Sequence, residues 1–403
     1  MRILLVSPHF YPENFKCNDV AFDLAKKGHE VTVLSDIPNY PIGHYFPGYG
    51  IFNKRVETVN GVRIIRTMVI PRGKGNAIRL LLNYASFAFF ASFNALYLAI
   101  FKKFDAILVH ETSPITVGLP ALVVKKIQRI PMHFWVLDLW PESLSAAGGI
   151  KNKHILNFFA GIAKCIYRNS AKILISSKGF RSSIQEKGDF ADKIEYFPNW
   201  AESTFTSKSS SVQNPELPHG FKVMFAGNIG EAQDFDHIME AANMLKNHKD
   251  IHFVIVGDGR KKPWVDEYVK KNDLSDTVHL LGRHPLESMP AFFKAADAML
   301  VSLNDNLIFN LTVPAKLQAY MAAGKPIIGM INGEAQNLIQ ESQCGLASNA
   351  EDAQKLANNI LALSQKSSDE LNRLGQNGFA YYEQHFAKEK CMQHLDEILS
   401  SKL

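Results

Sequence analysis

Three glycine-containing turns, each directly after an apolar run, carry the residue types that bind phosphate. They are FAGNIG (225–230), VGDGRKK (256–262) and LGRHP (281–285). Glycine lets an anion approach the backbone, and the start of a following helix offers free N–H groups. Because the carboxyl ends of parallel strands share one rim of a sheet, these turns predict a nucleotide-diphosphate site. The candidate phosphate-binding residues in them are Gly227, Asn228, Gly230, Gly257, Arg260 and Arg283.

A further candidate for phosphate binding is Lys316, within LTVPAKLQAYMAAGKPII (311–328). The polar LTVP turn precedes an expected helix, and Lys316 falls in the first turns of that helix. The helix dipole and the lysine charge both favour an anion there. The alternative is an ordinary solvated surface lysine.

The sequence Asp234-Phe235-Asp236 superficially matches the DxD motif that holds a divalent metal in other transferases. Here it begins the expected helix after GNIG, so we interpret the two aspartates as helix-capping residues. We therefore predict no metal site.

Short β-branched runs alternate with amphipathic stretches, which is typical of parallel α/β sheets. Each run is apolar and bounded by turn residues, as buried strands are. Helical spacing marks 19–30 and about 234–247, and the last 50 residues look wholly helical. The expected strands are 2–7, 31–36, 106–110, 132–138, 172–177 and 193–197, then 222–228, 252–259, 277–282, 298–303, 325–330 and about 345–347.

The length of 403 residues exceeds what one hydrophobic core usually supports, so two domains are expected. Residues 198–220 are rich in Ser, Pro and Asn and read as the connection between them. We predict one domain over 1–200, a second over 201–385, and a carboxyl-terminal helix over 386–403 that packs back on the first.

The four cysteines are scattered and form no CxxC pair, which fits a reducing compartment and argues against a disulfide framework or structural zinc. The amino terminus, MRILLVSPHF, is too short an apolar run for a signal peptide and reads as a first strand.

Charge is divided unevenly between the two halves of the chain. Residues 1–200 hold 25 Lys and Arg against 14 Asp and Glu, and the remainder holds 19 against 25. A basic first half suits anionic lipid or a pyrophosphate carrier. Nucleic acid is the rival partner, but no zinc finger, RNP-type strand or Arg-rich recognition helix is present in the sequence. The neutral alternative is that two similar halves have drifted in charge.

Residues 80–101 contain no charged residue, are rich in Phe, and are flanked by Arg79 and by Lys102 and Lys103. A helix lying in the membrane interface with cationic ends fits this pattern, and we expect a membrane-facing segment over 76–103. A helix buried in the protein and a true bilayer span are the alternatives.

Several blocks resemble glycosyltransferase family 4, a retaining family with the GT-B fold. In the second half they are GNIGEAQDFDHIMEAA, VGDGRKK, GRHPLESMPAFFKAADAMLVSL and TVPAKLQAYMAAGKPII. In the first half, SPHFYPENF, HEVTVLSDIPNYPIGHYFPGY and WVLDLWPESLSAAGGI are similar to a subgroup that builds bacterial surface polysaccharides, including N-acetyl-L-fucosamine transferases. The resemblance implies two Rossmann-like domains facing a central cleft, with a carboxyl-terminal helix crossing back.

The chain departs from this family at two positions. The family usually carries a Glu-x7-Glu pair, whose second Glu bonds the nucleotide ribose while the first supports the sugar. Leu311 and Ala319 occupy those places here. The resemblance still implies that the backbone amides of Thr312 and Val313 meet the diphosphate. The ribose contact must then come from elsewhere or be weaker.

The resemblance assigns the acceptor to the first domain. Asp138 and Glu142, in DLWPE after an apolar strand, are candidates to bind the acceptor hydroxyl and take its proton. His110 ends another strand at the same rim, and Lys16 is a candidate to reach the diphosphate across the cleft. The competing interpretation of Asp138 is a helix N-cap or a structural ion pair.

The resemblance and the charge asymmetry together predict a metal-independent enzyme with no cofactor. It would move a sugar, expected to be an N-acetylated amino or deoxyamino sugar, from UDP to a polyprenyl-diphosphate-linked saccharide. That reaction belongs to O-antigen or capsule synthesis, at the cytoplasmic face of the plasma membrane. Two alternatives stay open: a non-catalytic membrane-bound partner of a transferase, and a GT-B nucleotide-sugar epimerase.

Overall fold

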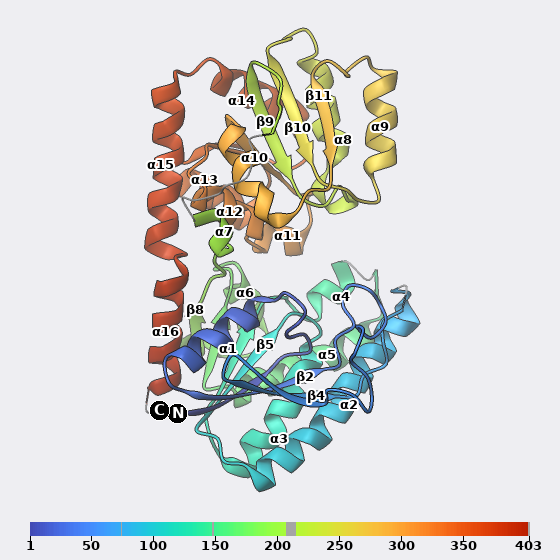
Figure 1. Ribbon diagram of the computed structural model, residues 1–403, viewed down its shortest axis with the longest axis vertical. Helices are drawn as coiled ribbons and strands as arrows, with labels where there is room; N and C mark the ends of the chain where they lie inside the picture. Colours follow the sequence, from blue (N-terminus) through green and yellow to red (C-terminus); the bar gives the residue numbers. More distant parts are fainter. Residues whose placement is uncertain (74, 147–148, 207–214, 402–403) are drawn as a thin grey trace. The chain divides into compact units, whose positions relative to one another are not determined.

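The computed structural model describes every residue of the chain except 74, 147–148, 207–214 and 402–403. It divides into two compact units, unit 1 with Met1–Phe197 and Met392–Leu403 and unit 2 with Pro198–Cys391 (Figure 1). The change of unit near Phe197 falls a few residues before the position expected from composition. At the other end it falls inside the last helix, α16 (Lys388–Ser400).

Unit 1 is built on an eight-stranded sheet in the order β3-β4-β2-β1-β5-β6-β7-β8. All neighbouring strands are parallel except β3 and β4, which form an antiparallel pair. The middle strands are buried on both faces, which explains why they read as unbroken apolar runs. The strands are β1 (Arg2–Val6), β2 (Glu30–Asp36), β3 (Val56–Val59), β4 (Val62–Thr67), β5 (Ala106–Glu111), β6 (Met132–Val136), β7 (Lys172–Ile175) and β8 (Ile194–Tyr196).

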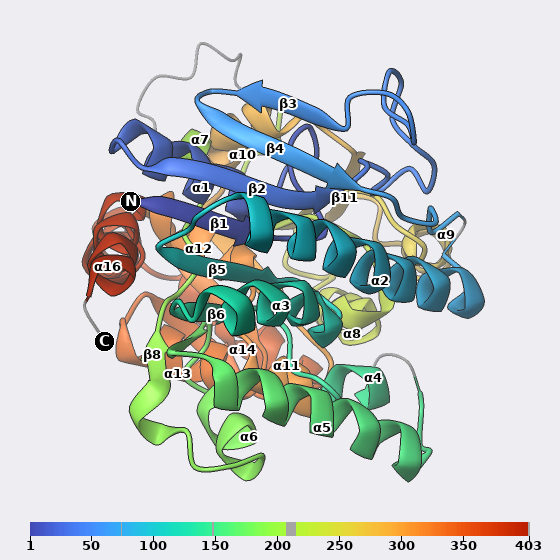
Figure 2. The same cartoon turned by 90° about the horizontal axis from the view of Figure 1, so that it is seen from below.

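Figure 2 shows α2, α3 and α5 lying over one face of this sheet. Close packing there needs a glycine at Gly118, because a Cβ would come within 3 Å of the Ile166 and Phe134 side chains. The helices of unit 1 are α1 (Lys16–Lys26), α2 (Ala77–Phe101), α3 (Gly118–Gln128), α4 (Glu142–Ala146), α5 (Lys153–Asn169) and α6 (Phe180–Glu186), with 3-10 turns at Ile115–Val117 and Ala191–Lys193.

Helix α2, which contains residues 80–101, has one buried side and one exposed apolar side. One side is buried and includes Phe87, Ala91 and Ala95, and the helix packs along α3. Polar side chains on the buried side are satisfied, since Asn83 Nδ2 donates to the Ile70 carbonyl at 2.8 Å. The opposite side carries exposed apolar residues, namely Ile78, Leu81, Leu82, Phe89, Phe93, Leu96, Tyr97, Ile100 and Phe101.

Unit 2 contains a six-stranded, wholly parallel sheet in the order β11-β10-β9-β12-β13-β14. The change of direction in strand order lies between β9 and β12, where open α/β sheets place their ligand sites. The strands are β9 (Phe221–Ala226), β10 (Ile251–Val256), β11 (Val278–Gly282), β12 (Ala298–Ser302), β13 (Ile327–Met330) and β14 (Gly345–Ser348).

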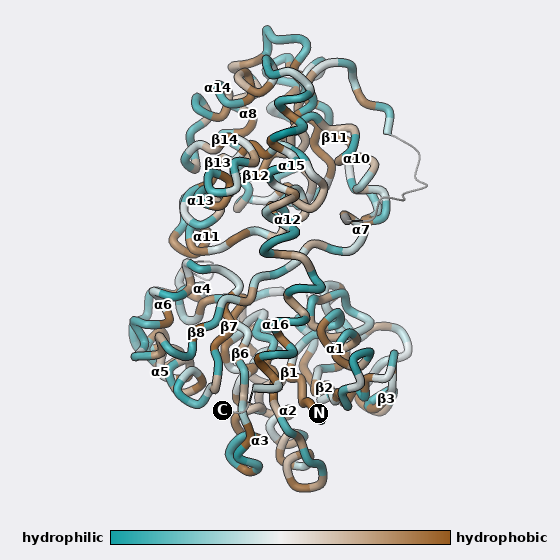
Figure 3. Tube along the Cα trace, turned by 90° about the vertical axis from the view of Figure 1, so that its left-hand side faces the viewer, coloured by the Kyte–Doolittle hydropathy of each residue, from teal (hydrophilic) through white to brown (hydrophobic). Residues whose placement is uncertain are grey.

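The core of unit 2 packs α8 and α14 against this sheet, with the Phe225 and Phe235 rings edge to face at 4.9 Å. In the hydropathy view of Figure 3, hydrophobic stretches gather at central strands such as β1 and β6 of the other unit as well. The helices of unit 2 are α7 (Ser203–Thr206), α8 (Phe235–Met244), α9 (Lys262–Lys271), α10 (Met289–Ala295), α11 (Leu307–Leu311), α12 (Ala315–Ala322), α13 (Gly333–Glu341), α14 (Ala353–Ser364) and α15 (Ser368–His385), with 3-10 turns at Glu231–Gln233 and Leu286–Ser288.

The last helix ties the end of the chain to unit 1. The Lys27 ammonium donates to the Met392 carbonyl at 3.0 Å, and His29 Nε2 lies 2.9 Å from an Asp396 oxygen. His394 Nε2 lies 3.4 Å from a Glu195 oxygen on β8. Polar contacts from Met392, His394 and Asp396 therefore hold α16 against unit 1.

Candidate functional site

A pocket of about 600 Å³ opens in unit 2 at the carboxyl ends of β9, β10 and β11. The three glycine turns that the sequence singled out therefore meet at one place. Five of the predicted donor-binding residues line it: Gly227, Asn228, Gly257, Arg283 and Lys316. The other lining residues are Glu202, Phe205, Ala226, Val256, Asp258, His284, Leu286, Met289, Phe293, Ala315, Ala319 and Tyr320.

The glycines at this rim are required by the fold as well as by any ligand. Gly257 has φ +155°, and a Cβ there would overlap the Gly227 carbonyl. The two turns are joined to their neighbours by backbone bonds, since Gly227 N donates to Val256 O at 2.9 Å and Gly257 N to Gly282 O at 2.8 Å. Glycine at 257 thus lets β9 and β10 end at the same level.

Lys316 is the central cation of the pocket. It lies in the first turn of α12, and its Nζ is buried without a hydrogen bond to any residue that the structure describes. Nζ sits 3.7 Å from the centroid of the Phe225 ring, and the side chain passes beside Gly227. Burial lowers the pKa of Lys316 to about 7. It is therefore a buried cation poised for an anionic partner, not a solvated surface lysine.

The pocket also has an apolar side. Phe205 stacks face to face on Phe293 with centroids 5.1 Å apart, and Phe293 meets the Tyr320 ring edge to face at 5.3 Å. Leu286 and Met289 complete this side. A pocket that is cationic at one part and flat and apolar at another suits a ligand with a diphosphate and an aromatic base.

Five predicted donor-site residues are not among those that line the pocket: Lys16 of unit 1, and Gly230, Arg260, Thr312 and Val313 of unit 2. The Thr312 amide donates to the Phe309 carbonyl at 3.1 Å, so the expectation that it meets the diphosphate is wrong for this conformation. A Cβ at Gly230 would collide with the Asn228 side chain, which gives this glycine a local role. Arg260 is exposed in the turn before α9.

The Asp234 and Asp236 carboxylates do not cap a helix as predicted. Asp234 stands at the N-cap position of α8, but with φ +53° and no side-chain bond to the helix amides. Its carboxylate bonds His237 Nδ1 at 2.7 Å, and Asp236 pairs with Lys261. The two carboxylates therefore pair with His237 and Lys261 and not with helix amides, which sequence spacing alone did not reveal.

In unit 1, Asp138 and Glu111 form a pair of neighbouring carboxyl groups after β6 and β5. The Asp138 amide donates to Glu111 Oε2 at 3.3 Å. Burial, reinforced by the nearby Asp138 charge, raises the pKa of Glu111 well above its usual range. Burial also raises the pKa of Asp138, against the opposing hydrogen bonds from Ser143 and Trp140. Burial of this kind favours the protonated form of a carboxyl group.

Asp138 is half-buried, so a ligand can reach it, and its carboxylate is held by hydroxyl and indole donors. Trp140 Nε1 donates to Oδ2 at 3.1 Å, and the Ser143 hydroxyl donates to Oδ1. Among the described residues it forms no ion pair and caps no helix. These contacts orient the carboxylate without neutralising it.

The two other unit 1 candidates are more enclosed. Glu142 begins α4 and pairs with Lys187, and it accepts a bond from the Ser183 hydroxyl at 2.6 Å. His110 is buried, with Nδ1 3.1 Å from Ser7 Oγ, and burial lowers its pKa to about 3, which keeps the ring neutral. Lys16 is the first residue of α1.

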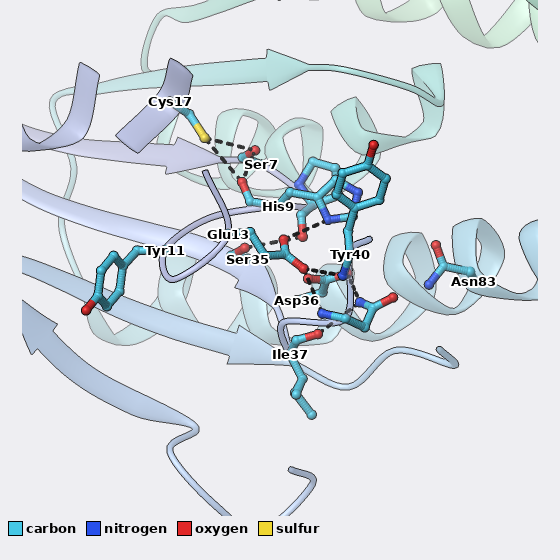
Figure 4. A network of polar contacts seen from close by, with 12 residues as sticks. Ser7, His9, Tyr11, Glu13, Cys17, Ser35, Asp36, Ile37, Tyr40 and Asn83 are labelled. Carbon is cyan, nitrogen blue, oxygen red and sulfur yellow. Dashed lines mark hydrogen bonds and ion pairs between the residues drawn. The ribbon is translucent and has the colours of Figure 1, made fainter. Parts of the chain in front are cut away.

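A buried network that the sequence did not predict ties the β1–α1 loop to the loop after β2 (Figure 4). Glu13 Oε1 accepts from the amides of Asn39 and Tyr40 at 2.7 and 2.6 Å. Glu13 Oε2 lies 3.0 Å from His9 Nδ1, and Asp36 Oδ2 accepts from Asn39 Nδ2 at 3.1 Å. Burial, reinforced by Glu13, raises the pKa of Asp36 well above its usual range.

His9, Glu13 and Asp36 each offer one ligand atom, all within 4.8 Å of one another. The residue types would suit a divalent cation. However, Glu13 Oε2 and His9 Nδ1 already lie within ion-pair distance of each other, and the positive charges of Arg66 and Arg72 act on Asp36. We interpret the network as a charge-balanced brace between two loops.

Comparison with known proteins shows which family the chain resembles. Residues 220–366 match the family model of glycosyl transferases group 1. The probable glycosyltransferase WbjE of Pseudomonas aeruginosa is 29% identical over 225 residues, which cover 52% of this chain and 55% of that protein. The putative colanic acid biosynthesis glycosyl transferase WcaI of Escherichia coli K12 is 24% identical over 336 residues, covering 80% and 82%. Over residues 220–366 the chain therefore resembles the glycosyl transferases of group 1, and the relatives that it matches are named glycosyltransferases.

Solved structures confirm the GT-B fold that the sequence predicts. HepE from Anabaena, in complex with UDP, superposes with a TM-score of 0.72 over 100% of both chains at 16% identity. Of the relatives WbjE and WcaI, WcaI is named for colanic acid biosynthesis. Among the lining residues that sequence reasoning missed are Glu202 and Phe205, since their linker composition carries no site signal.

Proposed function

We propose that this glycosyltransferase moves a sugar, of the N-acetylated amino or deoxyamino kind, from UDP to a polyprenyl-diphosphate-linked saccharide. The product would serve in O-antigen or capsule synthesis. The observation that carries the proposal is the pocket itself. Its lining combines the buried Lys316 ammonium and the exposed Arg283 side chain with a flat apolar wall. The cations would neutralise the charge of the diphosphate, and the apolar side would accommodate the uracil ring.

The choice of UDP rests on two supports. HepE, which shares the fold, has been solved with UDP. The resemblance to the N-acetyl-L-fucosamine subgroup favours both UDP and an N-acetylated sugar. The polysaccharide relatives WbjE and WcaI support a saccharide acceptor.

For the chemistry we propose retention of configuration. The bond between the anomeric carbon and the diphosphate oxygen breaks, and a bond to the acceptor oxygen forms on the same face of the sugar. The acceptor proton passes to the leaving diphosphate, so no protein nucleophile is required. Lys316 and Arg283 stabilise the negative charge that develops on the diphosphate. Asp138 binds and orients the acceptor hydroxyl.

We further propose that transfer needs no metal or other cofactor. In place of a metal ion, the Lys316 ammonium and the Arg283 guanidinium would neutralise the diphosphate, and both residues line the pocket. Unchanged turnover after extensive treatment with EDTA is the expected result. A loss that Mg²⁺ or Mn²⁺ restores would contradict this part of the proposal.

We propose that the enzyme works on the cytoplasmic side, bound peripherally to the membrane through α2. Among the described residues this helix alone has the length and hydropathy of a span, yet a third of its most apolar window is buried in unit 1. A span would pull Phe87, Ala91 and Ala95 out of the core, which favours docking by the exposed side. Arg79, Lys102 and other exposed cations at the helix ends suit anionic headgroups.

The test is an assay of purified enzyme with a panel of UDP-, GDP- and ADP-sugars and a polyprenyl-diphosphate saccharide. We expect transfer from a UDP-N-acetylated sugar, with release of UDP and retention at the anomeric carbon. Binding of nucleotide sugar without transfer to any acceptor would favour the non-catalytic partner. Conversion of the donor in the absence of acceptor would favour the epimerase.

A further inference from the structure

The linker helix supplies an acidic side chain to the pocket. Glu202 immediately precedes α7, and its carbonyl accepts the Phe205 amide at 2.9 Å. Helix α7 packs against α10 and α12, and Phe205 is fixed by its stack on Phe293. The position of Glu202 is therefore set by the apolar wall and not by a free linker.

Two acidic residues line the pocket, Glu202 and Asp258. Asp258 belongs to the turn after β10, where its Oδ1 accepts the amide of Gly259 at 2.8 Å. It is thus committed to the backbone of the turn. Glu202 comes instead from the side of the pocket formed by α7 and α12.

The groups that line the pocket suit the parts of a nucleoside diphosphate. Lys316 and Ala319 are three residues apart on α12 and so share a helix face. Tyr320, the next residue, contacts Phe293, which stacks on Phe205. A cation, a methyl group and stacked rings thus all line the pocket together with the side chain of Glu202.

We infer that Glu202 binds the ribose hydroxyls of the donor nucleotide, in the pocket where the Ala319 methyl group offers no acceptor. This inference rests on the proposed UDP-sugar site. A carboxylate accepts hydrogen bonds from two vicinal hydroxyls, whereas it would repel a phosphate. The neutral ribose is the part of a nucleoside diphosphate that an acidic side chain can hold. Glu202 is a specificity-determining residue for ribonucleotides.

The test compares UDP with 2′-deoxy-UDP by calorimetry for wild type, Glu202→Ala, Glu202→Gln and Asp258→Asn. Wild type should prefer UDP by about tenfold or more, the size of a hydrogen bond to a charged group. Glu202→Ala should bind the two ligands within about twofold of each other, and Glu202→Gln should fall between. Asp258→Asn should keep the wild-type preference, whatever its effect on affinity.

Equal discrimination in Glu202→Ala and wild type would overturn the inference while leaving the donor site intact. A wild type that binds neither nucleotide would instead remove the proposed function and this inference with it. Phe205→Ala gives a second measurement: loss of the stack should weaken the preference for UDP without abolishing binding of 2′-deoxy-UDP.

Discussion

The Lys316 ammonium lies 3.7 Å from the centroid of the Phe225 ring, at the end of β9 beside Gly227. The ring face offers the cation a weak electrostatic partner, but no hydrogen-bond acceptor among the described residues reaches it. An unsatisfied buried ammonium is costly to keep in a folded protein. A diphosphate would supply the acceptors that the protein withholds.

Binding of UDP should depend on pH through Lys316. Its pKa is about 7 in the free protein, and a bound diphosphate favours the charged form and raises that pKa. Below pH 7 the lysine is already charged, so affinity is nearly constant. Above pH 7 each complex must take up a proton, and affinity should fall by up to about tenfold per pH unit.

Calorimetry at pH 6.5 and 8 in buffers of different ionisation enthalpy measures this proton uptake directly. We expect close to one proton taken up at pH 8 and few at pH 6.5. Equal affinity at both values with no proton exchange would mean that Lys316 does not bind the diphosphate.

Gly257→Ala should destabilise unit 2 by about 2 kcal/mol or more, because its Cβ would overlap the Gly227 backbone at a strained φ. Gly282→Ala is the matched control. Its φ of +76° is also unfavourable, but nothing lies within 4 Å of the added Cβ, so about 1 kcal/mol is expected. Denaturant unfolding followed by the fluorescence of Trp264 compares the two. Equal losses would contradict the close packing at Gly257.

Asp138→Asn should lower kcat by about a hundredfold, since a neutral amide binds and orients the acceptor hydroxyl less strongly than a carboxylate does. The nucleotide pocket is built within unit 2, so the Kd for UDP should not change. Asp192→Asn, at an exposed carboxylate of the same unit, should leave both values as in wild type. An Asp138→Asn enzyme with normal kcat would remove Asp138 from the reaction.

Replacing Phe89 and Phe93 by Asp should abolish sedimentation with anionic liposomes. Both rings are 59% exposed on the outer side of α2, away from the buried side that packs in unit 1. Phe52→Asp is the control, since Phe52 is 95% exposed outside that helix. If wild type fails to sediment, or the double variant sediments as well as wild type, docking through α2 is wrong.

Part of the site could be predicted from the sequence because strand topology alone brings it together. Gly227, Gly257 and Arg283 each follow a strand, and parallel strands end at one rim. The burial of Lys316 and the place of Glu202 could not be predicted, since both depend on how α7, α10 and α12 pack. Composition marked the segment around Glu202 only as a connection.

Other differences have local causes. The β3–β4 pair was missed because its strands alternate with polar residues, although Asn60-Gly61 between them is a hairpin turn signal. Thr312 and Asp234 differ from expectation because of local hydrogen bonds that sequence spacing did not suggest. The Thr312 amide donates to the Phe309 carbonyl, and the Asp234 carboxylate bonds the His237 ring.

The most direct test of the donor site is a calorimetric titration of UDP into wild type, Lys316→Met and Lys294→Met at pH 6.5. Lys294 is an exposed lysine at the end of α10, outside the pocket lining. The proposal predicts binding to wild type and Lys294→Met with equal affinity, and binding at least about tenfold weaker to Lys316→Met. No binding to wild type, or equal binding to Lys316→Met, would contradict it.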